Sequence, residues 1–222
     1  MLHKTRGIVF RFTKYGETSI IVSIFTELYG IQSYIVNGVR SKSAKNKIAL
    51  YQPLTLLELV VYYKENAAIK RIKEIKCLHP YQTVTSDVRK SAVAMFINEI
   101  LNKTVKEETH AQDLCDFLIH SFIILDTQTE GAENFHLIFL LKLSRFLGFG
   151  AHYVNEVLGS RFTSEENERI LTELIEADYT STLTISNHQR REILELIVKF
   201  YLDHIESIGE IKSMQVLREV MS

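Results

Sequence analysis

The chain has 222 residues, of which 46% are hydrophobic and 24% charged, so it can bury a core and lies between one large domain and two small ones. Ten tyrosines, twelve phenylalanines and only two prolines exclude the polar, low-complexity composition of an unstructured chain. No apolar run approaches the roughly 18 residues of a membrane-spanning helix, and no apolar signal segment follows the first residues. We therefore expect a cytosolic protein without a membrane partner, in which Cys77 and Cys115 are reduced.

The net charge of −1 conceals two regions of opposite sign. Residues 1–80 contain 13 Lys and Arg against 5 Asp and Glu, a net charge of +8, whereas residues 81–222 contain 13 against 22, a net charge of −9. This asymmetry indicates two domains with different partners, and we expect the first to bind a polyanion. A solvated basic face without a ligand is the alternative.

The first 80 residues show the two-residue period of β-strands. A strand over residues 8–13, with Ile8, Phe10 and Phe12 on one face, precedes a turn and a second strand over residues 19–25, which predicts a hairpin. Further strands are expected over residues 31–37, 54–63 and 69–78, with a basic loop over residues 38–47. Five antiparallel strands with a long loop between the third and the fourth are typical of a small closed barrel of the OB type.

The remainder shows the wider spacing of helices, and Pro80 ends the sheet because proline cannot continue a central strand. Ser86 is the expected N-cap of the first helix, and Thr163 with Glu166 forms a candidate capping box. Residues 133–147 are apolar nearly all round, which predicts a central buried helix. Helices are expected over residues 86–102, 111–125, 133–147 and 163–177, from residue 187, and over 209–221. The predicted class is α+β, an N-terminal five-stranded OB barrel over residues 1–80 followed by an all-α domain over residues 81–222.

The sequence contains no phosphate loop, dinucleotide glycine fingerprint, nucleophile elbow or zinc-protease helix. Cys77 and His79 come nearest to a metal-ligand pair, but no second pair completes the four ligands of a structural zinc site. We therefore expect no cofactor, no metal and no enzymatic activity.

Cations interleaved with aromatic residues on an OB barrel indicate binding of single-stranded nucleic acid, because such barrels follow phosphates with Lys and Arg and stack bases on aromatic rings. The candidate phosphate contacts are Lys4, Arg6, Arg11, Lys14, Arg40, Lys42, Lys45, Lys47, Lys70, Arg71 and Lys73. The candidate stacking residues are Tyr15, Tyr34, Tyr62 and Tyr63. For each tyrosine the alternative is a place in the barrel core, where the aromatic residues of small barrels more often lie.

Short motifs follow one another in a characteristic order between residues 6 and 150. They are Gly7-Ile8-Val9, Tyr15-Gly16-Glu17, Ile21-Val22, Phe25-Thr26-Glu27, Gly30, Asn37-Gly38-Val39-Arg40, the loop containing Ser43, Gln52-Pro53-Leu54, Leu57-Glu58-Leu59, and Leu143 with Phe146-Leu147-Gly148. In their order and spacing these motifs resemble the RecO family of DNA repair proteins.

The resemblance implies a recombination mediator that binds and anneals single-stranded DNA, works with RecR and contacts the C-terminal tail of single-stranded DNA-binding protein. It further implies help in loading RecA and a cytoplasmic, nucleoid-associated location. Many members of the family carry zinc-binding cysteines after the leucine-glycine turn, where this chain reads Phe149-Gly150-Ala151-His152-Tyr153-Val154. The zinc module is therefore expected to be lost or replaced over residues 150–185.

An acidic and apolar tail needs an apolar groove with a few cations at its rim. On the expected central helix Lys142 and Arg145 are three residues apart and share a face, next to Phe139 and Phe146. These four residues form the candidate tail site, with pairing of the two cations to carboxylates of their own domain as the alternative. Two other functions remain open, an adaptor whose barrel has lost its affinity for nucleic acid and an enzyme acting on nucleotides.

Overall fold

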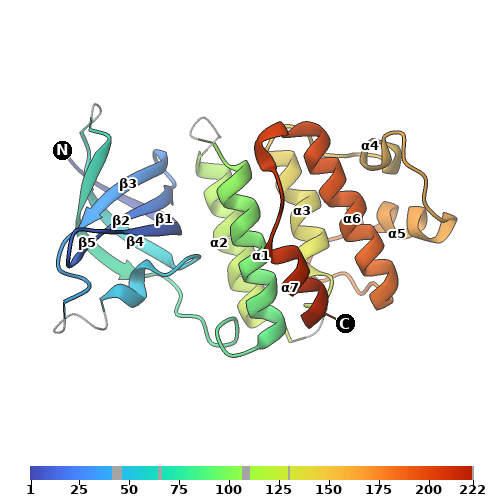
Figure 1. Cartoon of the computed structure of the whole chain (residues 1–222), viewed down its shortest axis with the longest axis horizontal. Helices are drawn as coiled ribbons and strands as arrows, with labels where there is room; N and C mark the ends of the chain where they lie inside the picture. The colour runs from blue at the N-terminus through green and yellow to red at the C-terminus, as the bar shows by residue number, and fades with distance from the viewer. Residues whose placement is uncertain (42–46, 65–66, 107–110, 130, 222) are drawn as a thin grey trace. The chain divides into compact units, whose positions relative to one another are not determined.

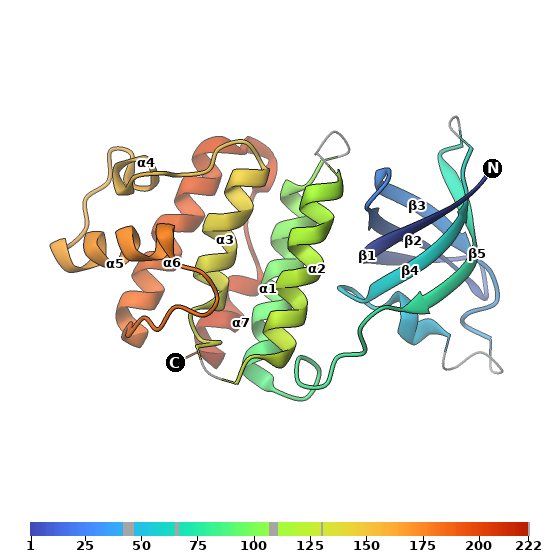
Figure 2. The same cartoon turned by 180° about the vertical axis from the view of Figure 1, so that it is seen from behind.

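The computed structural model describes residues 1–41, 47–64, 67–106, 111–129 and 131–221. Its backbone divides into two compact units, Met1–Tyr81 with Val105–Ile123 and Gln82–Thr104 with Ile124–Ser222. The first unit contains a closed five-stranded barrel and the second is helical (Figures 1 and 2). The α+β class with an N-terminal barrel is thus confirmed, while the domain boundary at residue 80 stays a prediction.

The barrel has the strand order β1-β2-β3-β5-β4, and β4 pairs with β1 to close it. Its strands are β1 (Leu2–Tyr15), β2 (Ser19–Thr26), β3 (Gly30–Val36), β4 (Leu56–Tyr62) and β5 (Ile69–Cys77). Four of the five pairings are antiparallel, but β3 and β5 run parallel. The expectation of a wholly antiparallel sheet is therefore wrong at this pairing, because five strands in a closed ring cannot alternate in direction all the way round.

A β-bulge in β1 changes which residues face the core. The register shifts between Val9, opposite Ile24, and Arg11, opposite Ser23. As a result Phe12 packs against the same core cluster as Val9. Phe10 instead stacks on Phe25, with ring centroids 5.6 Å apart and an interplanar angle of 8°. The predicted common face of Ile8, Phe10 and Phe12 is therefore wrong, since strict alternation cannot continue through an extra residue.

The strand β4 begins at Leu56 rather than at residue 54 because Leu54 has a φ of 67°. This left-handed conformation is costly for leucine, and the backbone N–H of Leu54 donates to the carbonyl of Val9 at 2.6 Å. Before it lies the 3₁₀ turn η2 (Ile48–Tyr51), which the sequence pattern did not predict. Tyr51 in η2 is buried in the barrel core.

The helices are α1 (Val88–Thr104), α2 (Ala111–Thr127), α3 (Phe135–Phe146), α4 (Val154–Leu158), α5 (Glu165–Glu176), α6 (Asn187–His204), the 3₁₀ turn η3 (Glu206–Ile208) and α7 (Ser213–Val220). Asp87 rather than Ser86 caps α1, because its Oδ1 accepts from the N–H groups of Arg89 and Lys90. Ser164 rather than Thr163 caps α5. Both corrections move the helix start by a residue or two, where several polar residues compete for the cap.

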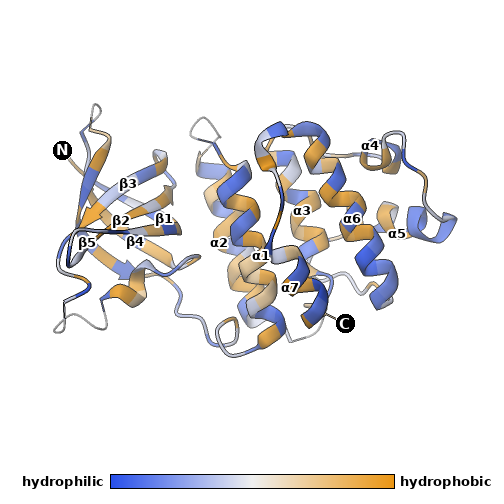
Figure 3. Ribbon diagram, viewed as in Figure 1, coloured by the Kyte–Doolittle hydropathy of each residue, from blue (hydrophilic) through white to orange (hydrophobic). Residues whose placement is uncertain are grey.

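The helix α3 forms the centre of the helical unit, as predicted. Nine of its twelve residues are buried, and it packs against α1, α5 and α6 (Figure 3). The chain leaves α3 through Gly148, whose φ of 86° is a common helix ending that favours glycine. Within the described residues no helix combines the length and the apolar character required to cross a membrane.

His136 on α3 is an uncharged group in the helical core. It is 1% exposed, its Nδ1 has no hydrogen-bond partner among the described residues, and the Phe96 ring meets it edge-on. Burial, with a smaller effect of the Arg190 cation, lowers the pKa of His136 to about 3. An unfolded histidine has a pKa of about 6.5, so below that pH the unfolded state binds a proton that the folded state does not.

Lowering the pH should therefore reduce the unfolding free energy of the protein. His136→Leu should remove this part of the pH dependence. Between pH 7 and pH 5 the parent should lose about 2 kcal/mol of unfolding free energy more than this variant. Urea unfolding at a series of pH values measures the difference, and His188→Leu, at a side chain that is 81% exposed, is the control. Parallel stability profiles for the parent and His136→Leu would contradict the assignment.

Candidate nucleic-acid interface

A groove opens in the barrel where β3 and β5 separate. The two strands pair only through Ser33 with Ile69, Tyr34 with Lys70 and Ile35 with Arg71. Beyond these pairs lies a hollow of about 550 Å³, lined by Ile35, Val36, Asn37, Val39, Lys47, Leu50, Tyr51, Arg71, Ile72, Lys73 and Ile75. The pairing of β3 with β5 thus closes the barrel over three residue pairs and leaves a hollow next to the last of them.

The groove has an apolar floor and a basic rim. Leu50 and Tyr51 of η2 face the hollow together with Ile72 and Ile75 of β5, and all four pack on the barrel core. Its cations are Lys47, Arg71 and Lys73, all exposed, and the lining residues that the structure describes include no carboxylate. Lys73 also forms an exposed ion pair with its neighbour Glu74, at 3.6 Å, which water screens. A concave surface of one sign concentrates the field and favours an anion.

The basic surface continues from the groove toward the β1–β2 turn. Asn37 at the groove accepts a hydrogen bond at 3.1 Å from the hydroxyl of Ser19, the first residue of β2. The Arg40 guanidinium donates to the carbonyl of Gly16 at 3.2 Å, which places Arg40 against the same turn. Three candidate residues at this end of β1 are exposed, namely Arg11, Lys14 and Tyr15.

The four candidate tyrosines have different surroundings. Tyr15 and Tyr62 are 52% and 49% exposed, and Tyr62 lies opposite Arg71 in the strand register. Tyr34 is fully buried in the core, where burial raises the pKa of its hydroxyl, so its ring offers no surface for stacking. Tyr63 stacks on Tyr29 with centroids 4.0 Å apart. The structure thus leaves Tyr15 and Tyr62 as open rings.

Lys70 is also occupied within the protein. Its side chain is mostly buried at 8% exposure, and its Nζ donates to the carbonyl of Ala67 at 2.9 Å. The ammonium lies 5.5 Å from the centre of the Tyr63 ring, a cation–π contact. Lys70 therefore supports the β4–β5 end of the barrel rather than extending the basic surface.

Arg6 is held by two carboxylates of its own unit. Its guanidinium donates to both carboxylate oxygens of Glu27, at 3.0 and 2.7 Å, and to Asp116 of α2 at 2.6 Å. These contacts raise the pKa of Arg6 further above its usual value, and the guanidinium lowers the pKa of Glu27. Paired in this way, Arg6 has little charge left for a phosphate.

Lys4 lies in a mixed surface on β1, β4 and β5. With Lys76 it lines a hollow of about 180 Å³ that also contains Glu58 and Glu74. The charges of the two lysines and the two glutamates cancel, whereas the described lining of the groove has cations and no carboxylate. Lys42 and Lys45, the other two candidates, lie outside the described residues.

The candidate tail site on α3 is only partly at the surface. Phe139 is fully buried and belongs to the helical core. Arg145 is exposed and donates to the carbonyl of Ile175 at 2.8 Å. Lys142 is half-buried, and burial and the Arg145 cation lower its pKa while Asp178 opposes the shift. Lys142 and the half-buried Phe146 remain the members best placed for a partner.

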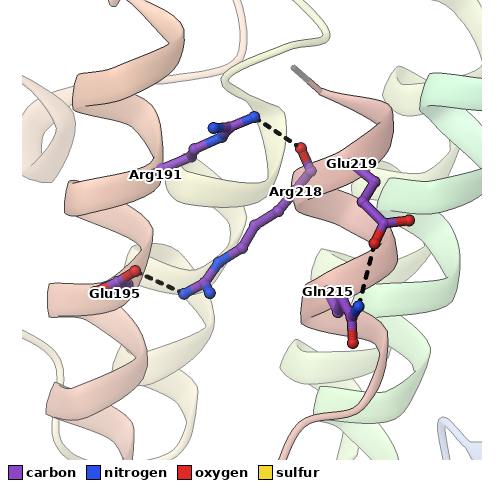
Figure 4. Close-up of a pocket in the computed structure, with 5 residues that line it drawn as sticks. All are labelled: Arg191, Glu195, Gln215, Arg218 and Glu219. Atoms are coloured by element: carbon purple, nitrogen blue, oxygen red, sulfur yellow. Dashed lines mark hydrogen bonds and ion pairs between the residues drawn. The ribbon is translucent and has the colours of Figure 1, made fainter.

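A second sizeable hollow, of about 450 Å³, lies between α6 and α7 (Figure 4). Arg218 donates to Glu195 at 2.8 Å, and Arg191 donates to the backbone carbonyl of Arg218 at 3.2 Å. Gln215 donates to Glu219 at 3.2 Å. Because two cations face two carboxylates here, this hollow has no net charge to attract a polyanion.

The residues present do not fit the zinc site that the family resemblance implies for many members. Over the described parts of the chain no group of three or more His, Cys, Asp or Glu side chains is placed to hold a metal. The corresponding residues 149–154 lead into the short helix α4, and the carboxylate of Glu156 accepts the backbone N–H groups of His152 and Tyr153 at 2.6 and 2.9 Å. Folding without metal stays a prediction.

Sequence reasoning missed the floor of the groove. Leu50 and Tyr51 lie in an unpredicted 3₁₀ turn, and nothing local indicates that they meet Ile72 and Ile75 across the barrel. The sequence pattern identifies Asn37 only as part of the motif Asn37-Gly38-Val39-Arg40, with no role at a site. The Asn-Gly pair is a turn signal, and Gly38 has a φ of 72°, but this signal does not place Asn37 at the groove.

The fold and the groove define a class of protein, a five-stranded OB barrel with a basic groove in the same chain as a helical unit. Two models of known protein families match this chain, one over the barrel and one over part of the helical half. The family model "Recombination protein O N terminal" matches residues 1–81, and "Recombination protein O C terminal" matches residues 85–167. The chain belongs to the RecO family of DNA repair proteins, and the resemblance seen in the motifs is confirmed.

Relatives of similar length support this assignment. The chain is 36% identical to the DNA repair protein RecO of Bacteroides fragilis over 241 residues, covering 99% of each chain. It is 34% identical to that of Phocaeicola vulgatus over 242 residues, covering 100% of each, and 34% to that of Flavobacterium psychrophilum over 236 residues, covering 99% of each. A role in DNA repair follows from this family membership.

The pairing of Arg6 predicts a structural rather than a DNA-binding phenotype. Arg6→Ala should lower the unfolding free energy by about 1 kcal/mol, a modest loss because the guanidinium is partly exposed to screening by water. The salt dependence of oligonucleotide binding should change by less than the slope of about 0.7 that one phosphate contact gives. Urea unfolding and salt titrations measure the two effects.

Arg11→Ala is the matched control, since Arg11 is exposed and forms no ion pair in the part of the chain that the structure describes. It should leave stability unchanged. A full loss of one phosphate contact in Arg6→Ala, with unaltered stability, would show that Arg6 faces DNA instead of its carboxylates.

Proposed function

We propose that this RecO-family protein is a recombination mediator that binds single-stranded DNA in the groove between β3 and β5. One observation carries the proposal, a concave surface with three cations and an apolar floor on an OB barrel, with no carboxylate among its described lining residues. Lys47, Arg71 and Lys73 follow the phosphates, and Tyr62 beside Arg71 offers a ring for stacking.

The proposed path of the single-stranded DNA extends from the groove to the β1–β2 turn. Asn37 and Ser19 connect the two regions by a hydrogen bond, and Arg40 lies against the turn itself. Arg11, Lys14 and Tyr15 continue the exposed surface. Such a track lets a non-catalytic protein hold and anneal DNA strands by charge and stacking, because neither interaction needs a reacting group.

Membership of the RecO family supports the proposed partners. The proposed mediator works with RecR, contacts the C-terminal tail of single-stranded DNA-binding protein and helps load RecA in the cytoplasm, near the nucleoid. Lys142, with Phe146 close by in the sequence, supplies the cation and apolar surface for the tail. The alternative function is an adaptor without affinity for nucleic acid. It does not explain why the described lining of the groove contains cations and no carboxylate.

Replacing Lys47, Arg71 and Lys73 together with alanine tests the proposal. If each neutralises one phosphate of a single strand, the plot of log affinity against log salt should become less steep by about 2. Fluorescence anisotropy with a labelled oligonucleotide at several salt concentrations measures this slope.

The double variant Lys4→Ala with Lys76→Ala is the control, because these cations share their hollow with Glu58 and Glu74. It should change the slope far less than the triple variant. An unchanged slope in the triple variant would move the site elsewhere, and a parent protein that binds no oligonucleotide would favour the adaptor.

A further inference from the structure

We propose that the groove between β3 and β5 receives one unpaired nucleobase, whose edge is bound by Asn37. This inference rests on the proposed binding of single-stranded DNA and adds what the groove recognises. A strand bound only by its phosphates would need cations alone, whereas this surface combines cations with an apolar hollow and an amide.

The size and lining of the hollow suit a base. Its volume of about 550 Å³ lies within the range of about 300–1,000 Å³ that is typical of small-ligand sites. Leu50, Ile72 and Ile75 are each only partly buried on the core, so they keep apolar surface that water covers in the free protein. A flat aromatic ring inserted there would remove this surface from water, which a phosphate cannot do.

The cations are placed for the nucleotide that carries such a base. Lys47 precedes η2, and Arg71 and Lys73 lie on β5, so positive charge borders the apolar floor from two elements of the barrel. With the base on the floor, its own phosphate and the neighbouring ones reach this rim. The ligand is therefore a nucleotide within a strand rather than a free apolar molecule.

Asn37 supplies polar recognition at the mouth of the hollow. Its Oδ1 accepts the hydroxyl of Ser19 at 3.1 Å, and the amide Nδ2 has two N–H donors that make no hydrogen bond within the described residues and can serve a ligand. Carbonyl oxygens and ring nitrogens on the edges of unpaired bases are suitable acceptors. In a duplex the complementary strand occupies the pairing edges and stacking holds the base, so a double strand cannot fill the hollow without extruding a base.

The test compares two oligonucleotides of equal charge and of about 12 nucleotides, a length that one OB fold can cover. One carries thymine at every position and the other carries abasic sites throughout. The parent should bind the thymine strand about tenfold more tightly. Asn37→Ala should reduce this ratio to about threefold or less by weakening only the thymine strand. Gln52→Ala, which removes an exposed amide that follows η2 and is not among the lining residues of the hollow, should leave the ratio unchanged.

Other outcomes distinguish failure of the proposed base site from failure of the proposed binding of single-stranded DNA. Equal, salt-sensitive binding of both strands by the parent would overturn the base site and leave single-strand binding intact. An undiminished ratio in Asn37→Ala, with an unaltered thermal transition, would overturn the role of Asn37. Binding of neither strand would overturn both proposals. A blunt duplex bound as tightly as the thymine strand would also contradict an unpaired base in the groove.

Discussion

The short parallel pairing of β3 with β5 is the constraint on which the barrel and its groove both depend. It joins the two strands through three residue pairs and so closes the sheet without leaving an edge there. The pairing stops at Ile35 and Arg71, and the residues that follow in both strands line the hollow together with Leu50 and Tyr51 of η2. A longer pairing would close the barrel further and remove the hollow, so the interface exists where closure is incomplete.

Local pairing, more than total charge, decides which cations of the barrel are available. Residues 1–80 carry a net charge of +8, yet Arg6 is bound to Glu27 and Asp116, and Lys70 donates to a backbone carbonyl. The groove concentrates positive charge because its described lining contains no carboxylate, whereas Lys4 and Lys76 share their hollow with two. The basic surface is therefore narrower than the sequence suggests. Its charged side chains are all cations only in the described lining of the groove, and even there Lys73 pairs with Glu74 at 3.6 Å.

Local patterns predicted the elements well and the contacts between distant elements poorly. Alternation located the five strands and apolar spacing located α3, because both depend on near neighbours. The bulge at Phe10, the left-handed Leu54 and the parallel pairing depend on tertiary contacts, so the sequence misplaced a face, a strand start and a strand direction. For the same reason the cations at the rim could be named in advance but the apolar floor could not, and Tyr34 could not be assigned to the core.

Hydrogen exchange measured by mass spectrometry, with and without a single-stranded oligonucleotide, tests the central claim most directly. Binding in the groove should slow exchange in the peptides that contain residues 35–39, 47–51 and 71–75, which line it. The peptide covering residues 56–60 lies partly in the charge-balanced hollow and should exchange unchanged. Protection confined to the helical unit, with the three groove segments unaffected, would contradict the account.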